Sequence, residues 1–371
     1  MMMMKSSDIY EPFFALLRAG LWDHRPDGTF SMLTAGQWER LYIMACRQTV
    51  EGIVFDGLLQ LPVKYFPPRP LLLRWTALVD HIERNNHKVD GVVAELTRIF
   101  TDHGITACLL KGQGVAACYS NPSHRVSGDI DWYFPCQGDF KKANKLMVSL
   151  GISLKKNAGF SVSYIWQGIL VEHHSRMFDF HNPFLATFLR QLEVSEVYNS
   201  SSLRVNSQSV LLPSPLLAHL QVNAHILKHQ LSYGIGLRQL CDSACLCRAT
   251  SMHVDAVHLQ EVYNKAGILA WIVRLYTFLV REIGLPVEFL PFSLPARLEI
   301  DFMKQDILHS GNFGFYACYP DTIAAICKTD GRSNVARSLF RHFWLNLRYA
   351  PGEACWFPLV HVYSHLLKYI S

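Results

Sequence analysis

Apolar residues recur every three or four positions in the N-terminal part of the chain, which is the spacing of helices with one buried face. The pattern runs from Tyr10 to about Leu61, stops at a proline-rich stretch, and resumes from Leu71 to His103. Gly104 follows directly, and a glycine at that place is typical of a helix C-terminus. The sequence therefore predicts an N-terminal helical region over residues 1–103.

The period of the apolar positions shortens after this region. Four runs rich in β-branched and aromatic residues are predicted to form strands, at Ile105–Leu110, Asp129–Phe134, Phe160–Trp166 and Ile169–Met177. Only Gln167 and Gly168 separate the last two runs, which predicts a hairpin. We therefore expect a core with β-strands over residues 104–205.

Helical spacing returns between and after these strands. Short helices are expected at Val115–Ser120 and Asp139–Gly151, and the pattern after about Val205 is almost entirely helical. This predicts a C-terminal helical domain over residues 206–371, which would form the far wall of a cleft.

Composition adds limits to this picture. Of the 371 residues, 50% are hydrophobic and 18% are charged, so the chain can bury a large core, with two or three lobes expected. The formal net charge is only +5, and no long basic run is present, which argues against nucleic-acid binding. The ten cysteines are expected to be reduced thiols, because the sequence has no convincing secretion signal or membrane anchor. These features favour a cytoplasmic protein that does not bind membranes.

Two carboxylates stand one residue apart in the second predicted strand, within the apolar run Gly128-Asp129-Ile130-Asp131-Trp132. Side chains alternate along a strand, so Asp129 and Asp131 are expected on one face and Ile130 on the other. Two carboxylates this close repel each other unless a cation lies between them, and hard oxygen ligands suit Mg²⁺ or Mn²⁺. Gly128 leaves room for an anion near the backbone.

A third carboxylate, Glu172, lies in the last predicted strand, on the same face as His174. If this strand is adjacent to that of Asp129 and Asp131, Glu172 completes a three-acid metal site or accepts a proton from a nucleophile. The alternative is a surface strand in which Glu172 pairs with Arg176.

The segment Lys111-Gly112-Gln113-Gly114 connects a predicted strand to a predicted helix. Backbone N–H groups at such a glycine turn can face an anion, although Gly-x-Gly also occurs in turns that bind nothing.

Taken together, these residues resemble a family. The Leu109-Leu110-Lys111-Gly112 turn, the Arg125-x-x-Gly128-Asp129-x-Asp131 segment and the Glu172-x-His174 strand are similar to the bacterial uncharacterised nucleotidyltransferase family. That family is placed in the DNA polymerase β-like nucleotidyltransferase superfamily. The resemblance extends from about Leu71 through His225, His229 and Asp242 to Gly311-Asn312-Phe313-Gly314.

The resemblance implies an α+β fold with a small mixed β-sheet, helices on one face and an active-site cleft on the other. It implies that Asp129, Asp131 and Glu172 bind Mg²⁺ (or Mn²⁺) and that His174 lies at the nucleotide. Gln113 stands where the superfamily usually has glycine or serine. Lys111, Gln113 or Arg125 would therefore have to contact the triphosphate in place of the usual serine hydroxyl. Ordinary salt bridges are the alternative for Lys111 and Arg125.

Three polar residues of the predicted C-terminal domain are candidate substrate contacts. His225 and His229 lie one helical turn apart, and Asp242 follows on another helical stretch. Contacts to base, ribose or acceptor are expected, and hydrogen-bonded core histidines are the alternative. No third ligand supports a zinc site at the two histidines.

The residues and the resemblance predict a Mg²⁺-dependent nucleotidyltransferase. It would transfer NMP, with AMP favoured, from a nucleoside triphosphate to a hydroxyl or phosphate of a small molecule, sugar, peptide or protein, and release pyrophosphate. A non-catalytic nucleotide-binding or interaction protein on the same fold is the alternative, favoured by the altered turn at Gln113.

Overall fold

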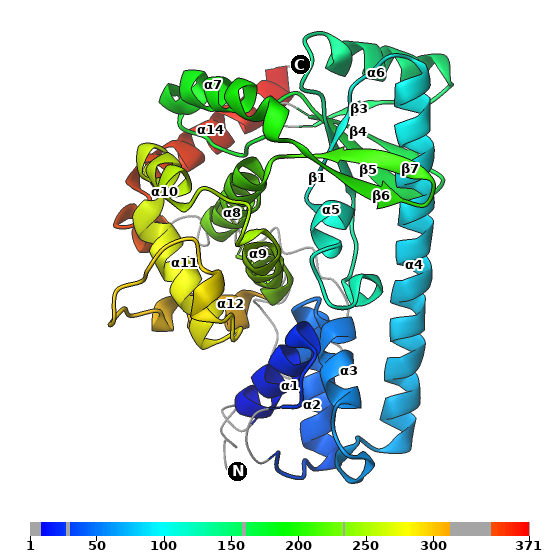
Figure 1. Cartoon of the computed structure of the whole chain (residues 1–371), viewed down its shortest axis with the longest axis vertical. Helices are drawn as coiled ribbons and strands as arrows, with labels where there is room; N and C mark the ends of the chain where they lie inside the picture. The colour runs from blue at the N-terminus through cyan, green and yellow to red at the C-terminus, as the bar shows by residue number, and fades with distance from the viewer. Residues whose placement is uncertain (1–8, 27–29, 158–160, 233, 312–342, 371) are drawn as a thin grey trace.

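The computed structural model describes residues 9–26, 30–157, 161–232, 234–311 and 343–370. Figure 1 shows a central sheet, a group of N-terminal helices at one end, C-terminal helices beside the sheet, and one long helix along the opposite side.

Three N-terminal helices form the first group: α1 (Tyr10–Trp22), α2 (Ala35–Arg47) and α3 (Glu51–Leu59). The start of α2 is fixed by a capping box, in which the Thr34 hydroxyl accepts from the Gln37 N–H and the Gln37 side chain accepts from the Thr34 N–H. Helices α1 and α3 touch through backbone, because a Cβ added to Gly20 would lie 1.8 Å from the Ile53 carbonyl oxygen. Glycine is therefore required at this crossing.

Helix α4 (Arg69–Asp102) connects this group to the sheet. It begins with Pro70 in its first turn, where the missing N–H costs nothing. It ends before Gly104, whose φ of 63° is left-handed. The helix expected at Leu71–His103 is therefore confirmed to within two residues at each end.

One mixed sheet of seven strands has the order β3-β4-β5-β2-β1-β7-β6. The strands are β1 (Cys108–Leu110), β2 (Ile130–Tyr133), β3 (Lys155–Lys156), β4 (Ser161–Trp166), β5 (Ile169–His174), β6 (Ser201–Val205) and β7 (Gln208–Leu212). Strand β2 is parallel to β5 and β1 is parallel to β7, while the other pairs are antiparallel. The predicted α+β class with a mixed sheet is confirmed.

The hairpin expected at Gln167 and Gly168 joins β4 to β5. Both turn residues have positive φ, 50° and 79°, which matches the twist of two-residue hairpins.

The two faces of the sheet differ in chemistry. One face is apolar and packs on α4 and on α6 (Asp139–Ser149), in a core that includes Ile130, Trp132 and Val171. The other face presents Asp131, Glu172 and His174, because side chains alternate along β2 and β5. The sequence correctly predicted which side chains of β2 enter the apolar layer.

The short helix α5 (Gly112–Ala116) follows β1 directly, three residues earlier than the helix expected at Val115–Ser120. The C-terminal helices are α7 (Ala186–Glu196), α8 (Pro215–Ser232), α9 (Leu237–Thr250), α10 (Ala256–Lys265), α11 (Leu269–Arg281), α12 (Asp301–Ser310) and α14 (Pro351–Ile370). Helices α8 and α9 lie beside α5 (Figure 1).

The prediction that the chain after Val205 is almost wholly helical is wrong at one place. Residues Gln208–Leu212 form β7, which pairs with β6 and with β1 inside the sheet. Leu203 and Val210 lie opposite each other and bury one side of this hairpin against α4. The division at residue 205 thus falls within a β-hairpin, and the three-part domain division stays a prediction.

The N-terminal and C-terminal helices share one core. Trp22 at the end of α1 donates from Nε1 to the Ile283 carbonyl oxygen at 2.8 Å. Gln48 donates to the Ile307 carbonyl oxygen at 3.0 Å and accepts from the Leu237 N–H at 2.9 Å. Regions that are far apart in sequence are therefore hydrogen-bonded to each other.

Among the described residues, every helix is too short or too polar to cross a membrane. The cysteines in this part of the chain are free thiols.

Candidate functional site

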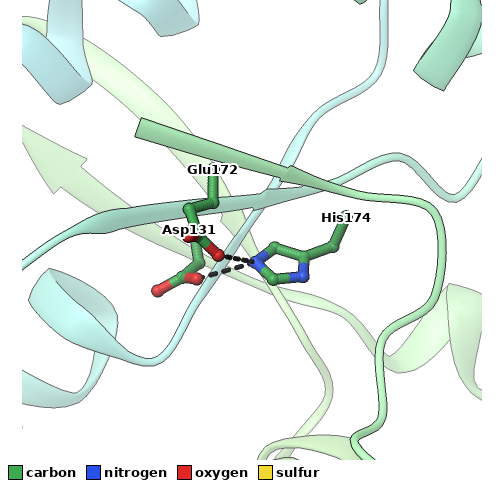
Figure 2. Close-up of side chains that lie close together, drawn as sticks. All are labelled: Asp131, Glu172 and His174. Atoms are coloured by element: carbon green, nitrogen blue, oxygen red, sulfur yellow. Dashed lines mark hydrogen bonds and ion pairs between the residues drawn. The ribbon is translucent and has the colours of Figure 1, made fainter. Parts of the chain in front are cut away.

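The acidic residues of the site come from two adjacent parallel strands. Strands β2 and β5 pair so that Asp131 lies opposite Glu172, and His174 lies two residues further along β5 on the same face. Figure 2 shows these three side chains converging from the two strands. The predicted adjacency of the Asp131 and Glu172 strands is therefore confirmed.

Asp131 is almost fully buried, at 1% exposure, and has two basic neighbours. One carboxylate oxygen lies 2.7 Å from His174 Nε2, and the other lies 2.9 Å from Lys111 Nζ. Burial alone would raise the pKa of Asp131, but the Lys111 charge and the His174 hydrogen bond lower it below its usual range. Asp131 is therefore ionised at neutral pH.

Glu172 lies at the edge of this group. Its Oε2 is 3.5 Å from His174 Nε2, and its Oε1 accepts from the Asn157 side chain at 3.3 Å. Burial, followed by the negative charge of Asp131, raises the pKa of Glu172. Repulsion between the two carboxylates therefore makes a cation favourable beside them.

The donor atoms fit a divalent metal ion. One ligand atom each from Asp131, Glu172 and His174 lie within 4.8 Å of one another. Two carboxylate oxygens suit Mg²⁺ or Mn²⁺, and the added imidazole nitrogen makes Mn²⁺ at least as suitable as Mg²⁺. His174 was expected at the nucleotide, and this grouping makes it a candidate metal ligand as well.

Asp129 is not part of this group of ligand atoms. Strand pairing begins at Ile130, so the alternation that orients Asp131 does not fix the side chain of Asp129. Asp129 is half-buried. Its charge joins that of Asp131 in raising the pKa of Lys111, against the lowering effect of burial. Asp129 is thus an electrostatic neighbour of the site, and its role as a ligand stays a prediction.

The turn after β1 positions Lys111. Lys111 has a φ of 36° and Gly112 a φ of 48°, so two consecutive residues are in a conformation that glycine alone adopts easily. The Gly112 backbone lies against the start of β2, since a Cβ there would be 3.6 Å from the Asp129 carbonyl oxygen. This unusual backbone directs Lys111 to Asp131, and such strain is typical of functional sites.

Gln113 and Gly128 lie beside the turn but differ in exposure. Gln113 is buried, donates from Nε2 to Asp90 at 2.6 Å and accepts from the Ser127 hydroxyl at 2.6 Å. Gly128 is exposed. Both hydrogen bonds fix the Gln113 amide within the protein, so a direct phosphate contact from Gln113 would require breaking them.

Arg125 and Asp242, which were expected at triphosphate and at substrate, are paired with each other. Arg125 donates from Nε and Nη2 to the two Asp242 oxygens at 2.7 and 2.8 Å, and the Tyr119 hydroxyl donates to Asp242 at 2.6 Å. Both charged residues are buried. The pair connects the loop before β2 to α9, and sequence reasoning missed this partnership because the two residues are far apart along the chain.

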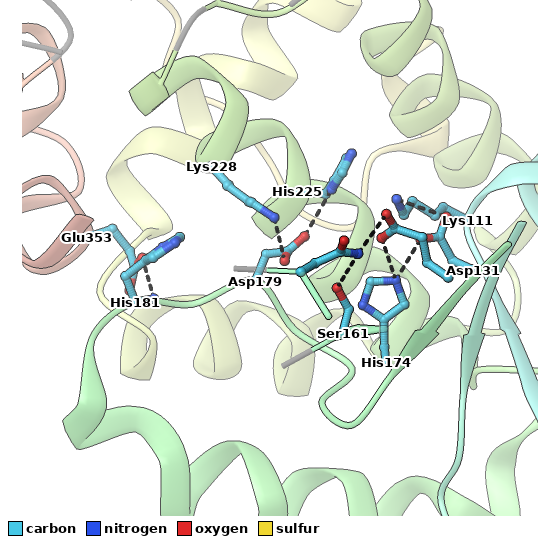
Figure 3. A network of polar contacts seen from close by, with 11 residues as sticks. Lys111, Asp131, Ser161, His174, Asp179, His181, His225, Lys228 and Glu353 are labelled. Carbon is cyan, nitrogen blue, oxygen red and sulfur yellow. Dashed lines mark hydrogen bonds and ion pairs between the residues drawn. The ribbon is translucent and has the colours of Figure 1, made fainter. Parts of the chain in front are cut away.

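A second polar cluster faces the acid site from α8. Asp179 accepts from Lys228 Nζ at 2.8 Å and lies 3.0 Å from His225 Nδ1 (Figure 3). Burial would raise the pKa of Asp179, but Lys228 and His225, with a contribution from Lys111, lower it well below its usual range. The cluster and Lys111 are therefore close enough to interact electrostatically.

His225 and His229, two of the three histidines of α8, are neutral at neutral pH. Burial, and then the Lys111 charge, lowers the pKa of His225, and burial lowers that of His229 well below its usual value. Their rings stack edge to face with centroids 4.4 Å apart. His225 is thus hydrogen-bonded to the cluster beside Lys111, and the roles of His225 and His229 as substrate contacts stay predictions.

Asp179 and Lys228 were not among the candidate residues. Lys228 follows His225 by three positions, a spacing that places both on one helix face and that could have identified Lys228. Asp179 lies in the segment after β5, where no periodicity indicates its direction. The Asn312-Phe313-Gly314 part of the family resemblance lies outside the described residues.

Comparison with known proteins adds a family. The chain matches the family model described as uncharacterised nucleotidyltransferase over residues 34–283, about two thirds of its length. This match begins earlier than the resemblance expected from Leu71 and ends before Gly311. No curated protein matches the chain.

A solved structure described as an antigenic nucleotidyltransferase-like protein from Paracoccidioides brasiliensis is similar at 16% identity. The match covers 53% of this chain and 93% of that one, with a TM-score of 0.34. The family match is the stronger finding, since its range contains Lys111, Asp131, Glu172, His174 and the α8 cluster. The chain therefore belongs to the uncharacterised nucleotidyltransferase family.

Proposed function

We propose that the protein transfers a nucleotidyl group, with AMP the favoured group, from a nucleoside triphosphate to an acceptor hydroxyl or phosphate, with release of pyrophosphate. The convergence of Asp131, Glu172 and His174 on one sheet face, in a chain of a nucleotidyltransferase family, carries this proposal. Membership of the DNA polymerase β-like superfamily and a bacterial origin are part of the same proposal.

Asp131 and Glu172 would hold Mg²⁺ or Mn²⁺ together with His174. When bound, such an ion stabilises the negative charge that spreads over the phosphoryl oxygens during transfer. Asp129, at the start of β2, is available as a further carboxylate. Glu172 is also the candidate general base toward an acceptor hydroxyl, because its raised pKa makes it a better proton acceptor than Asp131.

Lys111 would contact the triphosphate. Its ammonium group is held at Asp131 by a charge-assisted hydrogen bond, and a phosphate oxygen can accept the same kind of bond. Lys228 extends from α8 toward the same region, paired with Asp179. Arg125 is proposed to stabilise the fold through Asp242, so the positive charge at the phosphates would come from the two lysines.

The acceptor side of the site is proposed to lie at His225 and Asp179. A neutral imidazole can accept a proton from a hydroxyl group, and the ionised Asp179 orients the His225 ring through Nδ1. Asp179 would thereby act as a positioning residue.

Pyrophosphate release tests this function. The protein is incubated with labelled nucleoside triphosphates, Mg²⁺ or Mn²⁺ and a panel of acceptors, and wild type is compared with Asp131→Asn and Glu172→Gln. We expect each variant to lose about 100-fold or more of the rate, because each removes a carboxylate from the reacting centre. Asp80→Asn is the matched control, since Asp80 is exposed and pairs with the exposed Arg84 on α4.

Thermal unfolding of each variant separates lost chemistry from lost fold. Equal pyrophosphate release by wild type, Asp131→Asn and Glu172→Gln would reject the catalytic role. Metal-dependent nucleotide binding without release, across the whole acceptor panel, would favour a non-catalytic nucleotide-binding protein on the same fold.

A further inference from the structure

A pocket lies beside Lys111. It is formed where β1 and β7 end against α5, α8 and α9, and its empty volume is about 510 Å³, including open solvent at its mouth. Its walls are mainly apolar, with Leu109, Val115, Leu212, Val222 and Leu246 among them. Lys111 also lines it.

Gln221 of α8 is the polar feature of this pocket. The residue is only 3% exposed and lines the pocket wall. Within the described residues, its side-chain amide makes no hydrogen bond. The amide atoms are not sealed in the protein interior and border the open space of the pocket. The amide is therefore available to a group that enters the pocket.

Helix α8 connects this pocket to the acid site. Gln221, His225 and Lys228 follow at intervals of four and three residues, so they lie along one face of the helix. His225 and Lys228 meet Asp179 beside Lys111, while Gln221 reaches the pocket (Figure 3 shows the first two). A ligand with an anionic end at Lys111 and an apolar, hydrogen-bonding end in the pocket would follow this face.

We propose that this pocket holds the adenine ring of the nucleoside triphosphate and that Gln221 hydrogen-bonds its edge. The proposal rests on the proposed nucleotidyl transfer. Adenine presents a donor at N6 next to an acceptor at N7, and a glutamine amide supplies an acceptor and a donor in matching order. The apolar walls would cover the flat faces of the ring, as in most small-molecule sites.

Calorimetric binding in Mg²⁺ without acceptor tests the assignment. The ligands are ATP, GTP, CTP, UTP and inorganic triphosphate, which has the charge but no base. Wild type should bind ATP at least about tenfold more tightly than inorganic triphosphate and the other nucleotides, since each net hydrogen bond and buried ring face adds to affinity.

Two variants report on the pocket. Gln221→Met keeps the side-chain length but removes the amide, and should weaken ATP binding about tenfold while leaving inorganic triphosphate unchanged. Ala218→Leu fills the pocket from the same helix and should have the same selective effect. Gln191→Met, an identical change at an exposed position of α7, should alter neither ligand.

The assignment is overturned if wild type binds inorganic triphosphate as tightly as ATP. It is also overturned if Gln221→Met and Ala218→Leu leave the ratio of the affinities for ATP and inorganic triphosphate unchanged. A larger effect of Gln221→Met on the binding of GTP, CTP or UTP than on that of ATP would overturn it too. In those cases triphosphate binding and Asp131-dependent pyrophosphate release persist. Failure of the proposed function differs, because wild type would then release no pyrophosphate with any acceptor, whatever its affinity for ATP.

Discussion

Asp131 has two positively charged or proton-sharing neighbours before any ligand enters the site. Lys111 and His174 each contact one of its oxygens. A metal ion at the cluster would compete with both of them for the carboxylate, and Lys111 would then be released toward an incoming phosphate. Under the proposed function, exchange of partners at Asp131 would connect metal binding to triphosphate binding.

The Arg125–Asp242 pair leads to a prediction about stability. Asp242→Asn leaves the buried Arg125 without its counter-charge, so we expect a loss of about 3 kcal/mol in the free energy of unfolding at pH 7. Burial alone would raise the pKa of Asp242, but Arg125 lowers it below its usual value. The carboxylate therefore adds stability above its unfolded-state pKa, and this stability is lost as the pH falls through its folded-state pKa.

Urea unfolding at several pH values measures this effect. The gap between wild type and Asp242→Asn should be widest near neutral pH and should narrow in acid. The exposed Asp80→Asn serves as the control and should change stability by no more than about 0.5 kcal/mol. A gap that is constant with pH would show that the Asp242 charge does not contribute to stability.

At the scale of single residues, alternation along the strands allowed the sequence to predict which side chains share a face of the sheet. Asp131 and Glu172 share a face because they lie opposite each other in the paired strands β2 and β5. His174 shares it because it follows Glu172 by two residues. The partners of Arg125 and Gln113 were not predictable, because Asp242 and Asp90 reach them only through the packing of helices onto the sheet. Asp179 likewise depends on a segment without a periodic pattern.

Among the elements, the crossing of α1 and α3 depends on glycine. A Cβ at Gly57 would lie 1.9 Å from the Leu16 carbonyl oxygen, a backbone atom that cannot rotate away. Gly57→Ala should therefore force the helices apart and lower the free energy of unfolding by about 3 kcal/mol. Chemical denaturation measures the change.

Gly91→Ala is the matched control for this substitution. Gly91 lies in the exposed middle of α4, and nothing lies within 4 Å of its added Cβ. Alanine there should increase stability by about 1 kcal/mol through helix propensity. Similar effects at Gly57 and Gly91 would contradict the close backbone contact between α1 and α3.

The type of an element could be predicted where its apolar pattern continues over many residues or where a characteristic turn follows it. The repeated apolar positions of α4 identified it almost to its ends, and the Gln167-Gly168 turn identified the β4–β5 hairpin. Strand β7 was missed because it is only five residues long and is followed at once by the apolar pattern of α8. Short runs of this kind have no period that separates strand from helix.

For the molecule as a whole, we expect the chain to need both ends to fold. The core includes residues of α1, α3, α9 and α11 together with the sheet, and Gln48 joins α2 to both α9 and α12. A fragment of residues 1–205 would lack β7 and α8, leaving β1 and the apolar faces of the N-terminal helices uncovered.

Circular dichroism and denaturant unfolding of this fragment measure the outcome. We expect residual helix from α4 but no cooperative unfolding transition, whereas the full chain should show one. Cooperative unfolding of the fragment would instead support an independent unit ending at residue 205. The sequence alone could not reveal this dependence, since contacts between distant segments carry no local pattern.

The second strand that pairs with β1, β7, lies far along the chain. Cys108 pairs with Leu211, which is synthesised 103 residues later, and α8 with Gln221 and His225 comes later still. During translation, the nascent chain therefore displays β1 as an open sheet edge while β2 and β5 are already available to pair, and such edges invite association with other chains. Any pause of the ribosome in this interval would lengthen that exposure, so the speed of synthesis between β1 and α8 should affect how much active protein a cell obtains.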